Sequence, residues 1–458
     1  MITSHRSEQI APVLAWIDEH REEAIADVQR FCRQPSIAAQ HKGMKEMAAL
    51  VTASLKDLGA ETSVIPTPGY PVIVGNLAGE STRRLLIYDH YDVQPPEPLD
   101  EWKTPPFGAE IHDGTLYARG CADNKGNLVA RIWAARAWQA THGTLPCRVT
   151  FVVEGEEEVS SPHLEHFAAT HQDIVQADAC LWEAGYRTAQ GALTLYAGMK
   201  GQLYITLRVR GVGYDLHSSY APIAPNAAWR LIEALSTLYD PSGRVLIPHF
   251  YDAVLPPNER EHELMARFPL DIAALEQNWN TQHLLGPVDD PVAMTERLLF
   301  EPTCNICGIS SGYNGPGSKT IVPANASVKI DFRLVPDQEP PMILALLLRH
   351  LRDQGFRDVE VRAMEESWPA QSPVDTPLME ALIRSANIVY NIEPQVLPRN
   401  AGTGPMEQLC LRYGVPIVGG AGVGNHNSRS HAPNENIKIE DYVLGIKHVA
   451  ATMAEFAV

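Results

Sequence analysis

Four glutamates lie within five positions, at Glu154, Glu156, Glu157 and Glu158, and they directly follow residues 148–153. That run is rich in β-branched and aromatic residues, which predicts a buried strand that carries the glutamates at its end. Carboxylates this close raise one another's pKa unless a cation lies among them, and a bound metal is the strongest local cation available. Taken alone, the stretch is more typical of a solvated acidic loop. Whether it is a metal site depends on residues elsewhere in the chain.

Two other apolar runs also end in metal-binding residue types. His90 and Asp92 follow residues 85–88, and Glu183 follows residues 179–182. On extended backbone, the side chains of His90 and Asp92 project from the same face, so the carboxylate can accept the second imidazole N–H and fix its tautomer. An isolated His-x-Asp is more often a polar strand end. Here three separate strand-like runs each end in a histidine or carboxylate, which favours a shared site.

Two loops add further candidates. Asp123 and Asn124 stand just ahead of a helix expected over residues 128–139. One of them could be the helix N-cap, or a carboxylate at this point could bridge two cations. The Gly-rich stretch 419–424 leads to His426 and His431. His426 is interpreted as a surface residue, whereas the other motifs make His431 a candidate ligand.

The elements that must position these residues predict an α/β fold. Helices separate the three strand-like runs, which indicates a mainly parallel sheet with helices on both faces and ligands beyond the carboxyl ends of its strands. From residue 202 onward, alternating strands at 203–210, 327–335 and 358–364 accompany helices at 226–239 and 342–353. We therefore expect a catalytic domain formed by residues 1–201 and 371–458, with an inserted α+β domain at residues 202–370.

Composition limits the classes of function. The 458 residues carry a formal net charge of −18, which argues against nucleic acid as a partner. No apolar run is long enough to suggest a membrane span, and the N-terminal residues lack a signal-peptide core, so a cytoplasmic location is expected. Seven scattered cysteines fit reduced thiols. Cys304-x-x-Cys307 lacks a partner pair for a metal site, and residues 315–320 lack the second half of a P-loop.

The motifs together resemble the dinuclear zinc peptidases and deacylases of peptidase family M20. Relatives in that family include carnosine-type dipeptidases, aminoacylase, acetylornithine deacetylase and glutamate carboxypeptidase. The resemblance covers nearly the whole chain and rests on five segments, which makes it specific for the family and less so for the substrate. These segments are His90-x-Asp92, the stretch 118–126 around Asp123, Glu154-Gly155-x-Glu157-Glu158, Glu183 and His431-x-Pro-x-Glu435.

The resemblance implies two metal ions that share one carboxylate, with a general base beside them. The implied residues are Asp123 as the bridge, His90 and Glu183 at one ion, Glu158 and His431 at the other, Glu157 as general base, and Asp92 as the group that orients His90. Two cations about 3.5–4 Å apart can hold a water, lower its pKa and polarise a scissile carbonyl. A carboxylate beside them can pass the proton of the water to the leaving amine. Zn is the expected metal, with Mn or Co as alternatives because oxygen and imidazole ligands suit several metals.

The inserted domain is implied to act as a lid and as a dimerisation domain, which predicts a homodimer. His217 resembles a family histidine that reaches the active site of the other subunit and stabilises the tetrahedral oxyanion, although a surface histidine is the alternative. Arg333 and Arg399, with Gly402 and Thr403, lie where the dipeptidase branch binds the substrate carboxylate, and bidentate arginine suits a free carboxylate.

Three residues depart from the family pattern without removing a ligand. Asp89 replaces a common glycine before His90, Asn124 replaces a common second aspartate after Asp123, and Glu183 stands where many dipeptidases have aspartate. Residues 401–405 also differ from the carnosine-dipeptidase pattern. These departures leave the exact substrate open.

The sequence therefore predicts a cytoplasmic, dimeric, two-metal enzyme that hydrolyses the peptide bond of a short substrate with a free carboxylate, namely a dipeptidase. An N-acyl-amino-acid deacylase is the alternative, since it uses the same metals and base. A noncatalytic binding protein of the same fold is a third possibility. The expected partners are a small peptide or N-acyl amino acid and a second copy of the chain, with no nucleic acid and no membrane.

Overall fold

The computed structural model describes residues 2–458 and divides the chain into two compact units. The first comprises the chain up to Gly198, together with Gln371–Pro398 and Pro405–Val458. The second comprises Met199–Ala370 and Arg399–Gly404. Residues 399–404 were expected in the catalytic domain and instead belong to the second unit. The reason is backbone pairing, because the Lys200 amide donates to the carbonyl oxygens of Asn400 and Gly402 at 3.3 and 2.9 Å.

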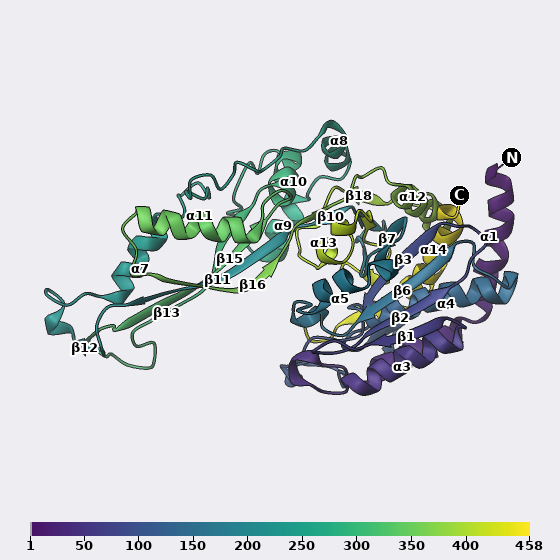
Figure 1. The fold of residues 1–458 in the computed structure, drawn as a ribbon, viewed down its shortest axis with the longest axis horizontal. Coiled ribbons are helices and arrows are strands. Elements are labelled where there is room, and N and C mark those ends of the chain that lie inside the picture. Colours follow the sequence, from purple (N-terminus) through teal and green to yellow (C-terminus); the bar gives the residue numbers. More distant parts are fainter. Residues whose placement is uncertain (1) are drawn as a thin grey trace. The chain divides into compact units, whose positions relative to one another are not determined.

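A six-stranded sheet forms the centre of the first unit (Figure 1). Four neighbouring strands are parallel, and two antiparallel strands extend one edge. In order across the sheet, the strands are β1 (Glu61–Ile65), β2 (Val72–Leu77), β6 (Arg148–Glu154), β3 (Arg84–His90), β7 (Ala179–Leu181) and β19 (Ile417–Val418). Strands β3 and β6 are buried along nearly their whole length, as strands covered on both faces are.

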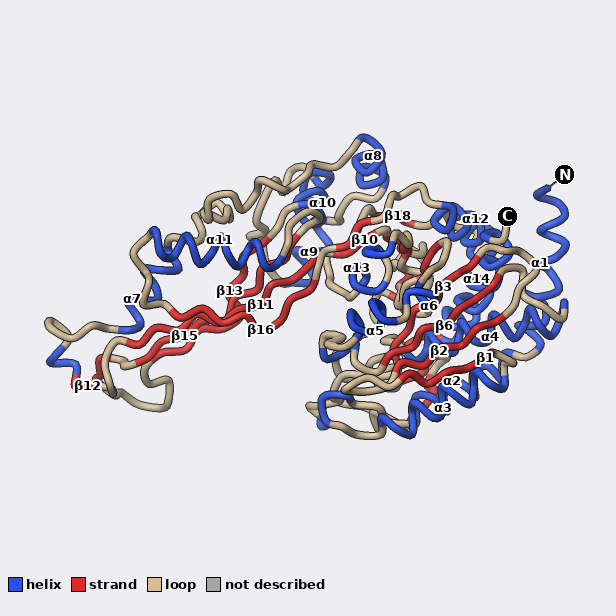
Figure 2. Tube along the Cα trace, in the orientation of Figure 1, coloured by secondary structure: helices blue, strands red, loops and turns tan. Residues whose placement is uncertain are grey.

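Helices surround this sheet and pack on one another (Figure 2). They are α1 (Ile2–Glu19), α2 (Arg21–Arg33), α3 (Met44–Asp57), α4 (Lys125–His142), α5 (Leu164–Thr170), α6 (Gln172–Val175), α12 (Pro377–Tyr390), α13 (Met406–Leu409) and α14 (Ile439–Phe456). The Trp138 indole on α4 donates to the Ala450 carbonyl on α14 at 2.8 Å, which joins two of the longest helices. None of the described helices is long and apolar enough to cross a membrane.

Short strands and turns complete the first unit. They are β4 (Glu110–His112), β5 (Thr115–Tyr117), β8 (Tyr186–Arg187), β9 (Thr194–Tyr196), β18 (Gln395–Leu397), β20 (Gly424–Asn425), β21 (Asn436–Lys438) and the 3-10 turns at Ala38–Gln40, Leu99–Glu101, Glu157–Val159 and Leu411–Tyr413. The chain crosses between the units at β10 (Gly198–Met199) and β17 (Ala370–Gln371), and again on either side of residues 399–404.

The second unit is built on a four-stranded antiparallel sheet. Its strands, in order, are β13 (Thr303–Ser311), β15 (Asn325–Leu334), β11 (Gly201–Arg210) and β16 (Glu360–Ser367). Helices α7 (Ala227–Ser236) and α11 (Pro340–Asp353) pack on it, and alternate residues of β11 and β15 form the core with them. The remaining elements are β12 (Leu216–His217), a 3-10 turn at Ser218–Tyr220, α8 (Glu259–Arg267), α9 (Ile272–Trp279), α10 (Pro291–Phe300) and β14 (Ile321–Val322).

The predicted fold class, a mainly parallel sheet with helices and an inserted α+β domain, is confirmed. Helices α8 to α10 and strand β13 were not predicted. The sequence did carry a signal for α8, since Asn258 and Glu261 form a capping box. Strand β13 is an edge strand with most residues exposed, so it lacks the burial alternation that would identify it.

Candidate metal centre

The predicted ligands gather at the carboxyl end of the central sheet. His90 is the last residue of β3, and it pairs in register with Glu154, the last residue of the parallel strand β6. Glu157 and Glu158 follow in the 3-10 turn after β6, and Glu183 lies two residues beyond β7. Because β3, β6 and β7 are parallel neighbours, their ends meet at one edge, where ligand sites of such sheets form.

Two loops supply the other candidates. Asp123 lies two residues ahead of α4, and His431 lies in the loop between β20 and β21. Asn124 occupies the N-cap position of α4, but its side chain makes no capping bond. The carboxylate of Asp123 faces the imidazoles of His90 and His431.

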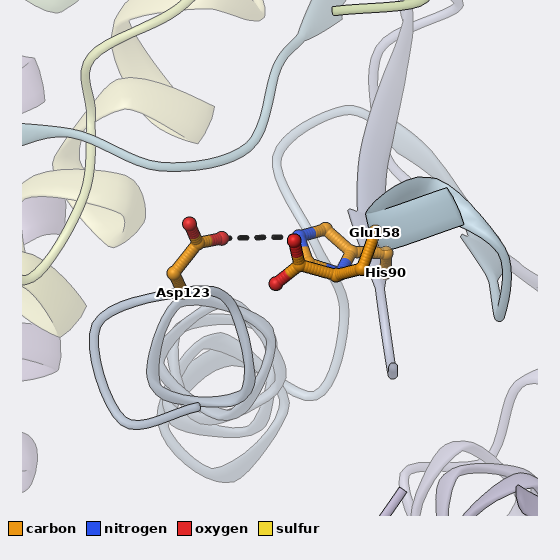
Figure 3. Close-up of side chains that lie close together, drawn as sticks. All are labelled: His90, Asp123 and Glu158. Atoms are coloured by element: carbon orange, nitrogen blue, oxygen red, sulfur yellow. Dashed lines mark hydrogen bonds and ion pairs between the residues drawn. The ribbon is translucent and has the colours of Figure 1, made fainter. Parts of the chain in front are cut away.

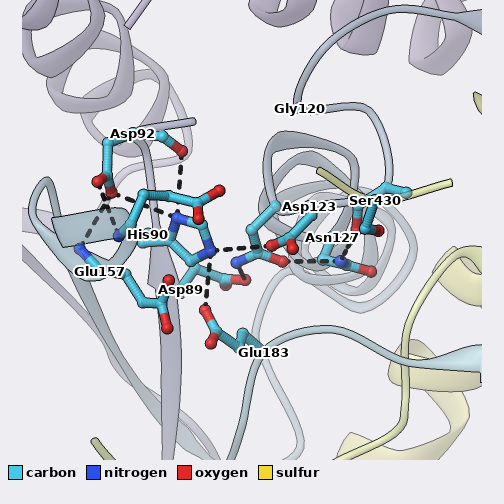
Figure 4. A network of polar contacts seen from close by, with 12 residues as sticks. Asp89, His90, Asp92, Gly120, Asp123, Asn127, Glu157, Glu183 and Ser430 are labelled. Atoms are coloured by element: carbon cyan, nitrogen blue, oxygen red, sulfur yellow. Dashed lines mark hydrogen bonds and ion pairs between the residues drawn. The ribbon is translucent and has the colours of Figure 1, made fainter. Parts of the chain in front are cut away.

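One group of ligand atoms centres on His90 (Figure 4). Its Nε2 lies 3.2 Å from Asp123 Oδ1 and 3.1 Å from Glu183 Oε2. The His90 side chain is fully buried. An imidazole nitrogen and two carboxylate oxygens thus point at one small region.

A second group centres on His431. Its Nε2 lies 3.1 Å from Asp123 Oδ2 and 3.2 Å from Glu158 Oε2. Figure 3 shows Asp123 facing His90, with Glu158 close to the imidazole. The two oxygens of Asp123 therefore face different histidines, as a carboxylate shared by two ions must.

Asp92 fixes the orientation of both the imidazole and the glutamate turn (Figure 4). Nδ1 of His90 lies 3.1 Å from the Asp92 carbonyl oxygen and 3.3 Å from its Oδ1. The Asp92 carboxylate also accepts the backbone N–H groups of Glu157 and Glu158 at 3.3 and 3.0 Å. This contact favours the tautomer with the proton on Nδ1, so that His90 in its neutral form presents the Nε2 lone pair to a metal ion lying among the carboxylates.

The spacing of these atoms fits metal ligation. Ligands bound at about 2.0–2.1 Å in a tetrahedral site lie about 3.3 Å apart, close to the separations around both histidines. One buried oxygen, Glu158 Oε1, accepts no hydrogen bond within the described residues. Buried polar atoms normally have partners, and a divalent ion would supply one. The residues present therefore fit metal ions.

The electrostatics also favour a cation. Burial and the neighbouring carboxylates raise the pKa of Glu157 and that of Glu183 well above their usual value. Contacts with Asp123 and Glu158 raise the pKa of His431 to about 10. Although burial lowers the pKa of His90, the surrounding carboxylates raise it well above its usual value. Protons on the histidines thus compensate the negative charge, and metal ions would compete with them for the same sites.

Glu157 is close enough to act in this site. Ligand atoms of His90, Glu157 and Glu183 all lie within 4.8 Å of one another. A carboxylate at that distance can ligate an ion or exchange a proton with a water held beside it. The geometry allows both roles, but Glu157 would be necessary for metal binding only if it ligates an ion.

Glu435 supports the site in a way that the sequence analysis did not assign. Its buried carboxylate accepts from Arg119 Nη1 at 2.8 Å and from the backbone amides of Gly120, Ala122 and Asp123 at 2.9, 2.9 and 3.0 Å. It therefore ties the loop of Asp123 to the segment that follows His431. The motif spacing showed Glu435 but not its partners, because these lie more than 300 positions away.

The two departures from the family pattern beside the ligands contact each other. Asn124 Nδ2 donates to Asp89 Oδ1 at 2.8 Å, and Arg131 Nη1 donates to the same oxygen at 2.8 Å. The buried carboxylate of Asp89 thus accepts a hydrogen bond from the amide of Asn124. An aspartate at position 124 would instead place a second carboxylate next to Asp89.

The substrate-binding candidates lie in the second unit and form a basic cluster. Arg333 Nη1 donates to Thr403 Oγ1 at 2.5 Å, and the Arg399 guanidinium lies 3.9 Å from the centre of the Phe300 ring. Lys200, which the sequence analysis missed, donates to the Gly402 carbonyl through its backbone. Burial, followed by the charge of Arg399, lowers the pKa of Lys200 to about 8.

His217 occupies a different part of the second unit. It is the last residue of β12, its side chain is exposed, and Nδ1 accepts the Ser219 amide at 3.2 Å. Nδ1 also lies 2.9 Å from the Ser219 hydroxyl oxygen. Nε2 has no hydrogen bond among those described.

Comparison with known proteins gives a consistent result. The model of peptidase family M20/M25/M40 matches residues 86–455. The Beta-Ala-His dipeptidase of Rattus norvegicus is 26% identical over an alignment of 490 positions that covers 100% of this chain and 97% of the relative. The Cys-Gly metallodipeptidase DUG1 of Candida albicans is also 26% identical, with 97% of each chain covered.

Solved structures of similar proteins share the fold along nearly the whole chain. The M20 family metallo-carboxypeptidase Sso-CP2 from Sulfolobus solfataricus is 38% identical, with a TM-score of 0.90 over 95% of this chain and 99% of that one. Human carnosine dipeptidase 1 is 26% identical, with a TM-score of 0.81 over 98% of this chain and 99% of that one.

Proposed function

The chain belongs to peptidase family M20/M25/M40, and from that membership we propose that it is a metal-dependent dipeptidase acting on short peptides with a free carboxylate. The observation that carries the proposal is the arrangement around Asp123. One of its oxygens faces His90, which also meets Glu183, and the other faces His431, which also meets Glu158.

In this proposal five side chains hold two divalent ions, with Asp123 shared between them. When bound, such ions lower the pKa of a water and polarise the carbonyl of the scissile bond. Zn is the favoured metal because imidazole and carboxylate ligands at these spacings suit it, and Mn and Co are alternatives.

The residues of the chain then perform the proton transfers. Glu157 accepts a proton from the attacking water at its carboxylate and passes it to the nitrogen of the leaving amine. In the metal-free chain, burial and the neighbouring charge of Glu183 raise its pKa, so its carboxylate readily accepts a proton. Asp92 holds the turn of Glu157 and the imidazole of His90 in place through the hydrogen bonds described above.

Recognition of the substrate carboxylate is assigned to the basic cluster of the second unit. Arg333 and Thr403 contact each other, and Arg399, Gly402 and Lys200 belong to the same cluster. A guanidinium beside a hydroxyl suits a free carboxylate, since arginine can donate two parallel hydrogen bonds. Arg399 is only 5% exposed, so we assign direct contact with the substrate to Arg333 and a supporting charge to Arg399.

We further propose a homodimer in which His217 stabilises the oxyanion in the other subunit. The proposal is supported by the exposed position of His217 at the end of β12 and by its Nε2, which is directed to no described partner. A hydrogen-bond donor directed at a developing oxyanion stabilises the transition state and so increases the rate of the reaction by a large factor. A cytoplasmic location is supported by the cysteines, since all seven are free thiols.

A carboxypeptidase is the second candidate, because the similar Sso-CP2 is named a metallo-carboxypeptidase. Both activities need a free carboxylate on the leaving residue and differ in the length of peptide accepted. The deacylase alternative is not favoured, since the curated relatives are named as dipeptidases. A noncatalytic protein would have no need of a complete ligand set with Glu157 beside it.

The test is amine release by metal-stripped protein, with Zn, Mn or Co added back, from four matched substrates. These are a dipeptide, the same dipeptide as its C-terminal amide, the N-acetyl derivative of its C-terminal amino acid and a pentapeptide with the same C-terminal pair. The pentapeptide distinguishes a dipeptidase from a carboxypeptidase, and the amide measures the need for a carboxylate.

A dipeptidase should release amine from the free dipeptide, with much lower rates on the amide, the N-acetyl amino acid and the pentapeptide. Comparable rates on the pentapeptide would assign a carboxypeptidase. Preference for the acetylated substrate would restore the deacylase, and no release from any substrate by metal-loaded protein would overturn the proposed enzyme.

A further inference from the structure

One face of helix α4 is polar although the helix is buried. Asn124 at its N-cap, Asn127 and Arg131 follow one another at spacings of three and four residues, so they share a face. All three are at most 1% exposed. Burying a guanidinium and two amides costs free energy that apolar side chains at the same positions would not cost. Their hydrogen bonds should therefore have a role that apolar residues could not fill. We call these three residues the α4 polar stripe.

Arg131 joins the ends of two strands. Its Nη1 donates to the Tyr88 carbonyl at 2.7 Å and to Asp89 Oδ1 at 2.8 Å, both at the end of β3. Its Nη2 donates to the Trp182 carbonyl at 2.6 Å, just after β7. The rigid planar fork of the guanidinium therefore sets the separation of these two strand ends.

The two asparagines extend the same network to the loop ahead of α4. Asn124 Nδ2 donates to Asp89 Oδ1 at 2.8 Å. Asn127 Nδ2 donates to Asn124 Oδ1 at 2.7 Å and to the Ala122 carbonyl at 2.9 Å, while its Oδ1 accepts the Val423 amide at 2.9 Å.

Most of the groups that this stripe holds belong to immediate chain neighbours of candidate ligands, the exceptions being the Tyr88 carbonyl and the Val423 amide. Asp89 precedes His90, Trp182 precedes Glu183, and Ala122 and Asn124 flank Asp123. These ligands are His90 and the two residues, Asp123 and Glu183, whose oxygens lie next to its Nε2. No member of the stripe contacts a neighbour of Glu158 or His431 among the hydrogen bonds of the described residues.

We propose that the α4 polar stripe is a positioning element for one metal site. It aligns His90 and Glu183, the two ligands that belong to this site alone, through Asp89 and Trp182, and it holds the loop of the shared ligand Asp123. The Glu158–His431 side is left to other supports. The inference rests on the proposed function, because it takes those three side chains as ligands. It assigns roles to Asn124, Asn127, Arg131 and Asp89 that concern metal affinity rather than the chemical step.

The alternative is that the stripe only stabilises the fold. In that case its loss would lower stability and leave both metal affinities unchanged in the protein that remains folded. A positioning role instead predicts a selective effect on one ion. Groups that orient metal ligands typically change affinity by about 10- to 100-fold when altered.

The experiment measures metal binding and not turnover. Arg131→Lys keeps the positive charge beside Asp89 but cannot span β3 and β7 with a planar fork. Affinities for Zn would be measured by chelator competition with folded, metal-stripped protein. The occupancy of each position would be measured by anomalous scattering from crystals grown at limiting Zn.

Arg384→Lys is the matched control. Arg384 donates from Nε at 2.7 Å to Glu455 Oε2, from Nη2 at 3.3 Å to the Glu455 carbonyl and from Nη1 at 3.4 Å to Glu380 Oε2, and it links α12 to α14. It is more exposed than Arg131, so melting temperatures would be recorded for both variants. This control separates a general loss of stability from a loss of ligand alignment.

A second pair of variants covers the case in which Arg131→Lys does not fold. Asn124→Asp places two carboxylates beside one guanidinium and removes the donor to Asp89. Combining it with Asp89→Asn again sets one amide opposite one carboxylate and restores the original charge of the network. Asn124→Asp should therefore weaken the same site, and the double variant should recover part of the loss.

We expect Arg131→Lys to weaken one Zn site about 10- to 100-fold, with occupancy lost at the His90–Asp123–Glu183 position and the other position retained. The inference would be overturned if Arg131→Lys bound Zn with the same two affinities as the unmodified protein. The same result in Asn124→Asp would overturn it where only that variant folds. So would equal weakening of both positions, or the same weakening in Arg384→Lys. Unmodified protein that binds no metal would instead refute the proposed function.

Discussion

Replacing Glu157 by glutamine removes a carboxylate from the site while keeping its size. The turn that carries Glu157 should persist, because its backbone and that of Glu158 bond to the Asp92 carboxylate at 3.3 and 3.0 Å independently of the side chain. Burial and then the charge of Glu183 raise the pKa of Glu157, so its ionised form is unfavourable in the metal-free chain. Glu157→Gln should consequently leave the melting temperature of metal-free protein unchanged or higher.

The effect on turnover follows from the loss of proton transfer. A positioned general base contributes about 10²–10⁴ in rate, which corresponds to about 3–5 kcal/mol at 1.36 kcal/mol per tenfold change. We therefore expect kcat to fall by that factor while KM and metal content change little. The assay is amine release from a dipeptide by protein loaded with Zn, with metal content determined on the same sample.

Glu156→Gln provides a matched control one residue away. Glu156 is also largely buried, but its carboxylate bonds to His163 Nδ1 at 2.7 Å and takes no part in the ligand groups. Its turnover should stay close to that of the unmodified chain. If Glu157→Gln kept full turnover, Glu157 would not be the base, and if it lost one metal ion, Glu157 would be a ligand instead.

Three further perturbations have defined outcomes. His217→Ala should lower kcat without unfolding the chain, and dimers that pair it with a Glu157→Gln partner should regain activity; no recovery would exclude action in the other subunit. Arg333→Lys should raise KM for free dipeptides about 10- to 100-fold, because that is the factor in affinity that one hydrogen bond to a charged group contributes. It should leave the slow hydrolysis of the C-terminal amide unchanged, and an equal effect on the amide would contradict this role. His448 is fully buried, and burial lowers its pKa to about 4, so below pH 6.5 the unfolded chain binds a proton that the folded chain excludes. The free energy of unfolding should therefore fall by up to about 3 kcal/mol between pH 6.5 and 4. Chemical denaturation of His448→Gln should show a shallower pH dependence, and an unchanged dependence would contradict this explanation.

The central sheet and the ligand groups could be predicted because their signals are local. His90, Glu158 and Glu183 each stand within a few residues of the end of an apolar run, and parallel strands bring such ends to one edge. Asp123 and His431 needed the resemblance to a known family, since an aspartate before a helix and a histidine on a loop are common in proteins.

The supports of the site could not be predicted in the same way. Arg131 looks like any charged residue on a helix, and only the tertiary structure shows that it is buried between β3 and β7. Residues 399–404 follow a stretch of the first unit in the sequence, and their pairing with Lys200 is a contact between distant segments. Long-range pairings of this kind leave no periodic pattern in the residues that form them.

The most direct test of the account is a titration of metal-stripped protein with Zn while hydrolysis of a dipeptide is followed. The account predicts no turnover in the stripped protein, two Zn ions bound per chain at saturation, and activity that appears as these sites fill. Full turnover in protein stripped of metal, or full activity with one ion per chain and no second binding event, would contradict the shared-carboxylate site around Asp123.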